Sequence, residues 1–300
     1  AYYLFFALKL IALGLLIRIW WRRFLPEKTL AIVLLVLVAF AFRETIIRDI
    51  YAGNISVFEQ LLIWSAVPLF LDRKVAGYCL LIGLAAVFKF ALVLLLLLPL
   101  IDRNRKATLW VVGTGVAVAG VGIASYYASP LLMEGFLVNV SALDMGGHAD
   151  QTSLAVIKEM LVWLSGATGG EFVRLATAFH IAFALFLLAV TIRITRGSNF
   201  RSNRLAFLVL CFFLYALVMP RLKDYSYILL IIPSFYVITT ILKSAIMRLV
   251  AIFFVCVSFL PYQAFLTAFV LYVVYLTQLK QLTASAPQPV SPVGREPSAP

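Results

Sequence analysis

Apolar segments separated by short polar stretches make up almost the whole chain, and one of these segments departs from the simple pattern. Residues 75–101 are apolar except for Lys89, and basic clusters lie just outside both ends, at 72–74 and 102–106. About 20 apolar residues cross a bilayer core, so this segment could form one span. Because positive residues favour the cytoplasmic side, one span would leave one cluster on the wrong side. The pattern therefore predicts two short helices that enter and leave by the same face.

In this hairpin Lys89 lies at the tip, deep in the membrane or near its far surface. An ammonium group at the centre of a membrane helix costs roughly 2.5–3.5 kcal/mol. A functional role would explain why the charge is kept there. The alternative is a lysine whose side chain snorkels to the far headgroups.

Further apolar segments predict spans on both sides of the hairpin. Residues 43–54 and 127–171 are expected to be exterior, and 152–164 has the spacing of an amphipathic helix at the interface. The fold class expected is all-α: a polytopic bundle of about nine spans plus a short re-entrant-like helix pair. The remaining predicted spans are 1–20, 29–42, 55–71, 108–126, 172–192, 205–219 and 226–242, followed by an out-and-back pair within 249–277.

The distribution of basic residues supports this topology. Sixteen Lys and Arg residues fall on the predicted cytoplasmic side and six on the predicted exterior side, while Lys9, Arg18 and Lys89 lie within spans. A bias of this kind sets the orientation of membrane proteins. If residues 75–101 formed a single span, every later loop would change sides and the bias would largely cancel.

Composition agrees with a membrane protein and excludes a soluble domain. The chain of 300 residues is 64% hydrophobic and 13% charged, with a mean hydropathy of +1.04. The net charge of +12 arises from basic residues at the ends of apolar runs, so we expect membrane lipids and no nucleic acid as partners.

Small residues within the spans are expected to have packing roles. Four glycines in the predicted span 108–126 would allow close helix packing, and three cysteines in apolar runs form neither a disulfide framework nor a metal site. These residues are Gly113, Gly115, Gly120 and Gly122, and Cys79, Cys211 and Cys256.

The two ends of the chain differ in character. No initiator methionine is present and residues 1–3 resemble the inside of a span, so we expect a truncated N-terminus. Residues 1–282 are expected to form one transmembrane domain, incomplete at its N-terminus. Residues 283–300 are rich in Pro, Ser and Ala and are expected to be a disordered cytoplasmic tail.

Polar residues that topology alone does not explain gather on the predicted exterior side. Mixed acids and bases there would suit a site that binds a charged headgroup and moves a proton, although short exterior loops also need polar residues in any case. Arg221 and Lys223 are the strongest indication of such a site, because cations on the exterior side oppose the positive-inside tendency. The set comprises Arg43, Glu44, Arg48 and Asp49; Asp144, His148 and Asp150; and Arg221, Lys223 and Asp224, with Lys89 approaching from the membrane.

Motifs of soluble enzymes are absent from the sequence. It contains no phosphate-cradling glycine loop, nucleophile elbow, metal-spaced Cys/His set or dinucleotide fingerprint. We therefore expect no cofactor and no metal, and no nucleotide-driven pump.

Four degenerate blocks occur in order between Arg48 and Pro233. They are Asp49–Asn54; Ala76-Gly77 with Gly83–Ala86, Lys89 and Pro99; Asp150–Leu154; and Pro220–Tyr225. Together they resemble glycosyltransferase family 87, membrane enzymes of the GT-C superfamily that include bacterial polyprenyl-phosphate-mannose-dependent mannosyltransferases.

The resemblance implies transfer of a hexose, with mannose expected, from a polyprenyl-phosphate carrier to a lipid or glycan acceptor. The reaction would take place on the extracytoplasmic face of a bacterial plasma membrane. A carboxylate would deprotonate the acceptor hydroxyl while cations stabilise the departing phosphate. The roles implied are catalytic for Asp49 and Asp224; donor-phosphate binding for Lys89, Arg221 and Lys223; and substrate binding for Arg48, Asn54, His148, Asp150, Gln151 and Tyr225.

Three alternatives stay open at this point. In the superfamily the catalytic aspartate commonly lies in the first exterior loop, which would precede residue 1, so the main base could lie upstream. A transporter or flippase of lipid-linked sugars would also use broken helices and intramembrane charges, although no internal repeat is present. An O-antigen-ligase-like or polymerase-like enzyme would require a large arginine-rich exterior loop, which the sequence lacks.

Overall fold

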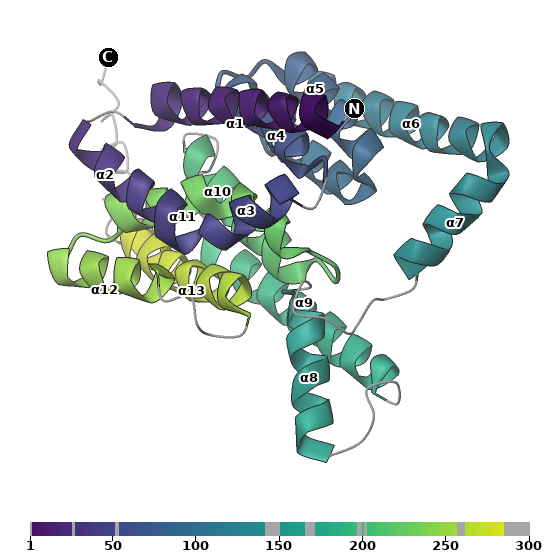
Figure 1. Cartoon of the computed structure of the whole chain (residues 1–300). Coiled ribbons are helices and arrows are strands. Elements are labelled where there is room, and N and C mark those ends of the chain that lie inside the picture. The colour runs from purple at the N-terminus through teal and green to yellow at the C-terminus, as the bar shows by residue number, and fades with distance from the viewer. Residues whose placement is uncertain are drawn as a thin grey trace, which may run out of the picture.

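In the computed structural model, all elements formed by the described residues are helices, which confirms the all-α class (Figure 1). The described residues are 2–25, 28–51, 54–141, 151–165, 172–196, 200, 203–256 and 262–284. Three of the described helices are long and apolar enough to cross a membrane, namely α1 (Tyr2–Phe24), α6 (Arg105–Ala128) and α9 (Val173–Thr195). A helix of this length extends about 35 Å, more than the thickness of a bilayer core.

The apolar helices differ in how far they are buried. Helix α10 (Arg204–Val218) is buried along most of its length, whereas α1, α6 and α9 expose much of their apolar surface. Without a hydrophobic force between helices in lipid, close packing and hydrogen bonds hold such elements together. The other helices are α2 (Lys28–Val36), α3 (Arg43–Tyr51), α4 (Ser56–Leu71), α7 (Pro130–Ser141), α8 (Ser153–Ser165), α11 (Ile231–Tyr236), α12 (Ala245–Cys256) and α13 (Gln263–Ala284).

An aromatic stack joins three of these elements at the centre. Trp64 of α4 makes edge-on contacts with Trp20 of α1 at 6.0 Å and with Phe212 of α10 at 5.5 Å between ring centroids. Edge-to-face geometry of this kind adds stability beyond the buried area. The stack therefore fixes α1, α4 and α10 relative to one another.

The predicted hairpin is present. Helix α5 (Val75–Phe88) ends at Lys89, whose backbone is extended, and η2 (Phe90–Asp102) returns as a 3₁₀ helix. The Tyr78 hydroxyl donates a hydrogen bond to the Leu95 carbonyl oxygen at 2.6 Å, so the two arms lie side by side. This contact confirms that the segment folds back on itself at Lys89.

The expected packing role of the α6 glycines is wrong for the described part of the chain. A Cβ atom added at Gly113, Gly115, Gly120 or Gly122 would meet nothing within 4 Å. The close approach instead uses Gly83 of α5, where a Cβ would lie 2.5 Å from Thr114 Cγ2 of α6. Helix α6 packs against α5 and η2, and none of its four glycines makes that close contact.

Two elements differ from continuous spans. The predicted span at 226–242 consists of a 3₁₀ helix η3 (Asp224–Leu230), then α11, then a π-helical turn η4 (Val237–Ile241). Helix α2 likewise continues into a π-helical turn, η1 (Leu37–Ala41). Interruptions of this kind are frequent near functional sites.

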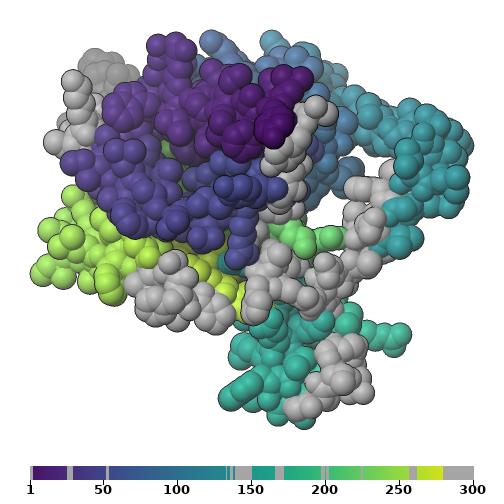
Figure 2. Space-filling model, viewed as in Figure 1, coloured from purple at the N-terminus to yellow at the C-terminus, as the bar shows by residue number. Residues whose placement is uncertain are grey.

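Helix α8 confirms the helix expected at 152–164. Only its first turn, at Ser153–Ala155, is buried, while Trp163 and Leu164 are exposed. Figures 1 and 2 show α8 projecting from the main body. Its location at a membrane interface stays a prediction. The proposed tail mostly lies outside the described residues, because α13 continues to Ala284 and 285–300 are not described.

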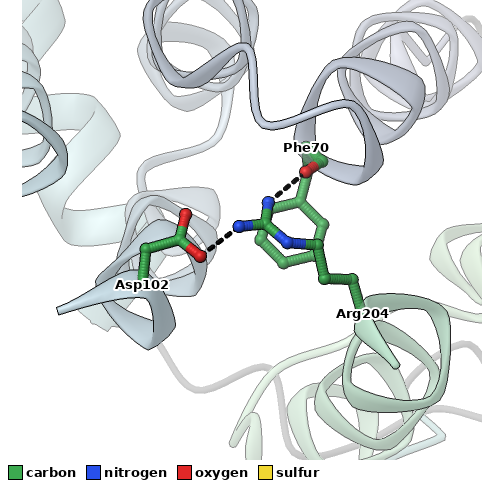
Figure 3. Close-up of polar contacts among 3 residues, drawn as sticks. All are labelled: Phe70, Asp102 and Arg204. Atoms are coloured by element: carbon green, nitrogen blue, oxygen red, sulfur yellow. Dashed lines mark hydrogen bonds and ion pairs between the residues drawn. The ribbon is translucent and has the colours of Figure 1, made fainter. Parts of the chain in front are cut away.

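A set of contacts made by Arg204, which we call the Arg204 tie, joins three segments at the end of the hairpin away from Lys89. The guanidinium group of Arg204, at the start of α10, forms an ion pair with Asp102 and donates a hydrogen bond to the Phe70 carbonyl oxygen (Figure 3). It also lies over the Phe70 ring, 5.1 Å from the centroid. The tie holds together the ends of α4 and η2 and the beginning of α10.

Candidate functional site

Three of the four sequence blocks meet around the fourth, at η3. Helices α3, α4 and α13 all pack against η3, which directly follows the loop at 219–223. The hairpin tip reaches η3 through Lys89, and the segment at 151–155 reaches it through Gln151. The fold therefore brings together blocks that are far apart in the sequence.

Lys89 is held by two side chains from other elements. Its Nζ atom donates a hydrogen bond to Ser226 Oγ at 2.7 Å and lies 3.8 Å from Glu59 Oε2 on α4. An extended backbone at residue 89, between α5 and η2, directs the chain out of the helix at this point. The ammonium group thus has partners within the protein, which argues against a lysine that simply snorkels to the headgroups.

A second ion pair lies nearby, between α1 and α3. Lys9 Nζ is 3.4 Å from Asp49 Oδ2, and it also donates a hydrogen bond to the Asp49 carbonyl oxygen. The same ammonium group lies 5.5 Å from the centroid of the Phe5 ring. Burial raises the pKa of the Asp49 carboxyl, and the Lys9 ammonium partly opposes this by lowering it.

These residues form what we call the charge cluster: Lys9, Asp49, Glu59, Lys89 and Ser226. Asp49 interacts electrostatically with both Glu59 and Lys89, so the two ion pairs are coupled. Two cations balance two anions, which is how buried charges are normally stabilised. The side chain of Lys89 is 26% exposed, against 6% for Glu59, 1% for Lys9 and 0% for Asp49. Lys89 is therefore the member of the cluster that a ligand can reach.

The segment at 151–155 contributes structural ties to the same region. The Tyr227 hydroxyl donates to the Gln151 carbonyl oxygen at 2.5 Å, and Gln151 Oε1 accepts from the Ala264 amide at 2.8 Å. Thr152 Oγ1 donates to the Pro220 carbonyl oxygen at 3.2 Å. These contacts connect the segment to η3, to the loop before η3 and to the beginning of α13.

Ser153 extends this network into α9. Its Oγ lies 2.7 Å from His180 Nδ1 and 3.2 Å from the Leu217 carbonyl oxygen. Both side chains are buried, so this pair is shielded from ligands in the described structure.

The other predicted site residues vary in how they are placed. Arg48 is exposed on α3, Asn54 is half-buried just before α4, and Arg221 and Lys223 are half-buried in the loop before η3. Asp224 and Tyr225 begin η3, and the structure describes their backbone but not their side chains. Asp144, His148 and Asp150 lie outside the described residues.

Sequence reasoning missed three members of the charge cluster: Lys9, Glu59 and Ser226. Lys9 and Glu59 are charged residues within apolar segments, and ionisable residues in such segments commonly mark functional sites. That signal could have identified both. Nothing comparable marks Ser226, because its role depends on the position of the hairpin tip.

Metal ligation finds no support in the described part of the chain, where no three His, Cys, Asp or Glu side chains are grouped closely enough to hold an ion.

Comparison with known proteins gives one match. A sequence model of glycosyltransferase family 87 matches residues 1–220, which contain the first three blocks and the first residue of the fourth. Neither a curated protein nor a solved structure matches the chain. The match covers well over half of the chain and confirms the resemblance inferred from the blocks. The chain therefore belongs to glycosyltransferase family 87 and is a membrane glycosyltransferase that uses a sugar donor and an acceptor.

Proposed function

We propose that this glycosyltransferase moves a hexose, with mannose expected, from a polyprenyl-phosphate carrier to a lipid or glycan acceptor. The observation that carries the proposal is the placement of Lys89. Its side chain is partly exposed at the tip of an apolar hairpin, and its ammonium group is oriented by Glu59 and Ser226. A cation in that position suits the phosphate of a donor whose long hydrocarbon chain lies in the membrane.

Lys89 would act on the leaving group. In the reaction the bond between the sugar C1 atom and the phosphate oxygen breaks, and the phosphate leaves with the electron pair. A bond forms between C1 and the acceptor oxygen, with inversion at C1. Fixed positive charge at the departing phosphate is effective in a site of low dielectric constant, because it needs no reorganisation during the reaction. Arg221 and Lys223, on the loop before η3, would add to this charge.

The proton of the acceptor hydroxyl passes to a carboxylate, for which Asp49 and Asp224 are the two candidates within the chain. The raised pKa of Asp49 favours proton acceptance, but its side chain is buried and paired with Lys9. Asp224 begins η3, two residues before the Ser226 that binds Lys89. Substitution of each aspartate by asparagine separates the two assignments. Only replacement of the true base should lower kcat of the folded protein by the 10²–10⁴-fold typical of such groups.

The extracytoplasmic face is proposed from the distribution of charge. The charge cluster lies at the hairpin tip, and the basic residues that flank the hairpin lie at its other end. Because positive residues favour the cytoplasm, the tip and the cluster would face the opposite side.

The decisive experiment compares Lys89→Met with Lys243→Met, an exposed cation in the connection between η4 and α12, away from the charge cluster. Each protein is reconstituted in phosphatidylcholine vesicles with synthetic polyprenyl-phosphate mannose and a lipid acceptor, and radiolabelled transfer is counted. We expect Lys89→Met to lower kcat/KM by at least about 100-fold, and Lys243→Met to match the parent.

Equal turnover in folded Lys89→Met and the parent protein would overturn the phosphate site. Transfer from a nucleotide-linked sugar, with none from the polyprenyl-phosphate sugar, would overturn the donor assignment while leaving glycosyl transfer intact.

A further inference from the structure

A cavity of about 430 Å³ lies at the end of the hairpin away from Lys89. One wall is formed by residues 73–77, at the start of α5. The other is formed by Asp102, Asn104, Lys106 and Ala107, where η2 ends and α6 begins. Cations from both of the basic clusters that flank the hairpin in sequence therefore face one shared space. A volume of this size is typical of sites that bind small ligands. We call it the basic cavity.

The charge of the basic cavity is positive. Arg73, Lys74 and Lys106 line it, and the acid among its lining residues is Asp102. That carboxylate is already paired with Arg204 (Figure 3). Arg204 is not among the residues that line the cavity. Arg204 thus neutralises the Asp102 carboxylate, and the positive charges of the three lining cations face the cavity.

The backbone adds to this positive potential. No side chain caps the beginning of α5, whose first residues form part of the cavity wall. The start of a helix carries partial positive charge that favours anions. Helix α6 begins at the same cavity, although there the Asn104 side chain accepts a hydrogen bond from the Lys106 amide.

An exposed apolar surface continues from the basic cavity along both adjoining helices. Leu80 lies one turn beyond Gly77 on α5, and Leu109, Val112 and Val116 follow Lys106 on one face of α6. A free phosphate ion would use the cavity alone. A phospholipid would use both features, with its headgroup phosphate in the cavity and its acyl chains along these helices.

We propose that the basic cavity binds the headgroup phosphate of an anionic phospholipid. The site is separate from the charge cluster and does not depend on the proposed sugar donor. Basic pockets between membrane helices on the side rich in positive charge suit such headgroups. The lipid bridges the beginnings of α5 and α6 and stabilises the base of the hairpin.

The test measures how many phospholipids the purified protein keeps. The chain is exchanged from vesicles of phosphatidylcholine with one-fifth phosphatidylglycerol into mild detergent, and bound lipid is counted by native mass spectrometry. The parent should retain one phosphatidylglycerol per chain. The triple variant Arg73→Gln, Lys74→Gln, Lys106→Gln should bind it on the order of 100-fold more weakly, since each of the three cations that line the cavity is expected to contribute about fivefold in affinity.

The matched control removes three exposed cations that do not line the cavity: Arg103→Gln, Arg105→Gln and Lys243→Gln. This variant should retain the lipid as the parent does. Equal loss from both triple variants would overturn the proposal, because general attraction to the membrane surface would then explain the binding.

A second variant changes shape without changing charge. Ala76→Phe fills part of the cavity and should also release the lipid, with the melting temperature in detergent reporting that the protein is folded. Full retention in folded Ala76→Phe would overturn the site. If millimolar inorganic phosphate displaces the lipid, the cavity recognises the phosphate group of the lipid. Stabilisation by inorganic phosphate without any retained phosphatidylglycerol would overturn the lipid assignment.

Discussion

Lys9 and Asp49 depend on each other because neither has access to water. Both side chains are buried, and their charged atoms lie 3.4 Å apart. Removing one partner of a buried ion pair leaves a charge that the interior cannot solvate. The pair therefore links α1 to α3 with more specificity than apolar packing would give.

We predict that Lys9→Met lowers the free energy of unfolding by about 3–5 kcal/mol, because it leaves the Asp49 carboxylate unpaired. The double variant Lys9→Met, Asp49→Leu should regain most of the loss, since it removes both charges. Denaturant titration in detergent measures each value. Arg18→Met, which removes an exposed cation from the same helix, is the control. A loss as large in Arg18→Met would contradict the special role of the pair.

The Lys9→Met defect should depend on pH. Burial already raises the pKa of Asp49 above 3.8, and loss of the Lys9 ammonium should raise it further. A raised pKa in the folded state means that stability is fully present below the ordinary value and is lost as pH rises through the folded value. The difference between Lys9→Met and the parent should therefore shrink as pH falls towards 3.8. A difference that is constant with pH would contradict this explanation.

Among the elements, α5 and α6 approach closely at one glycine. The 2.5 Å separation between an added Cβ at Gly83 and Thr114 Cγ2 leaves no room for a side chain. Threonine is short and stiff at χ1 in a helix, so it cannot move aside easily. The distance between these helices therefore depends on the absence of a side chain at residue 83.

We predict that Gly83→Val lowers the free energy of unfolding by about 1–3 kcal/mol, the usual effect of overpacking. Gly113→Ala is the control, because a Cβ there meets nothing within 4 Å. The double variant Gly83→Ala, Thr114→Ala should be more stable than Gly83→Val. Unfolding in detergent provides the measurement, and equal losses from Gly83→Val and Gly113→Ala would contradict the close contact.

In the described part of the molecule, the ion pairs lie near the two ends of the hairpin. The charge cluster surrounds Lys89 at the tip, and the Arg204 tie and the basic cavity lie at the base. The aromatic stack centred on Trp64 lies in the bundle that joins them. The hairpin is thus fixed at both ends by charged side chains from other elements.

We predict that Arg204→Met lowers stability by about 3–5 kcal/mol, because it leaves the Asp102 carboxylate without its cation. Arg204→Lys should recover only part of the loss, since one ammonium group does not reproduce two directed guanidinium hydrogen bonds. Thermal unfolding of the reconstituted protein measures both variants. Full recovery in Arg204→Lys would show that charge alone accounts for the tie.

The sequence was sufficient to predict the features that depend on local pattern. The hairpin followed from two basic clusters around one apolar run, and α8 followed from apolar spacing at 152–164. The four blocks also identified the family correctly. Charge position and helical periodicity are both visible in a single stretch of chain, which is why these predictions succeeded.

Pairings between distant elements could not be predicted in this way. Lys9 and Asp49 are separated by two helical segments, and Ser226 meets Lys89 only because η3 lies at the hairpin tip. The α6 glycines were misinterpreted because a small residue indicates a close contact only if another helix faces it. Which helix faces which is a property of the packed bundle and not of any one segment.

The two arms of the hairpin differ in their rise per residue, so the position of the tip depends on the number of residues in each arm. An α-helix advances 1.5 Å per residue and a 3₁₀ helix about 2.0 Å, so the 14 residues of α5 advance about 21 Å and the 13 residues of η2 about 26 Å. Loss of one residue from η2 would draw the tip back by about 2 Å and rotate it by a third of a turn. The 2.7 Å bond between Lys89 and Ser226 could not survive such a shift. Many sequences could form an apolar hairpin here, but few insertions or deletions in its arms would leave the position of Lys89 at the tip unchanged.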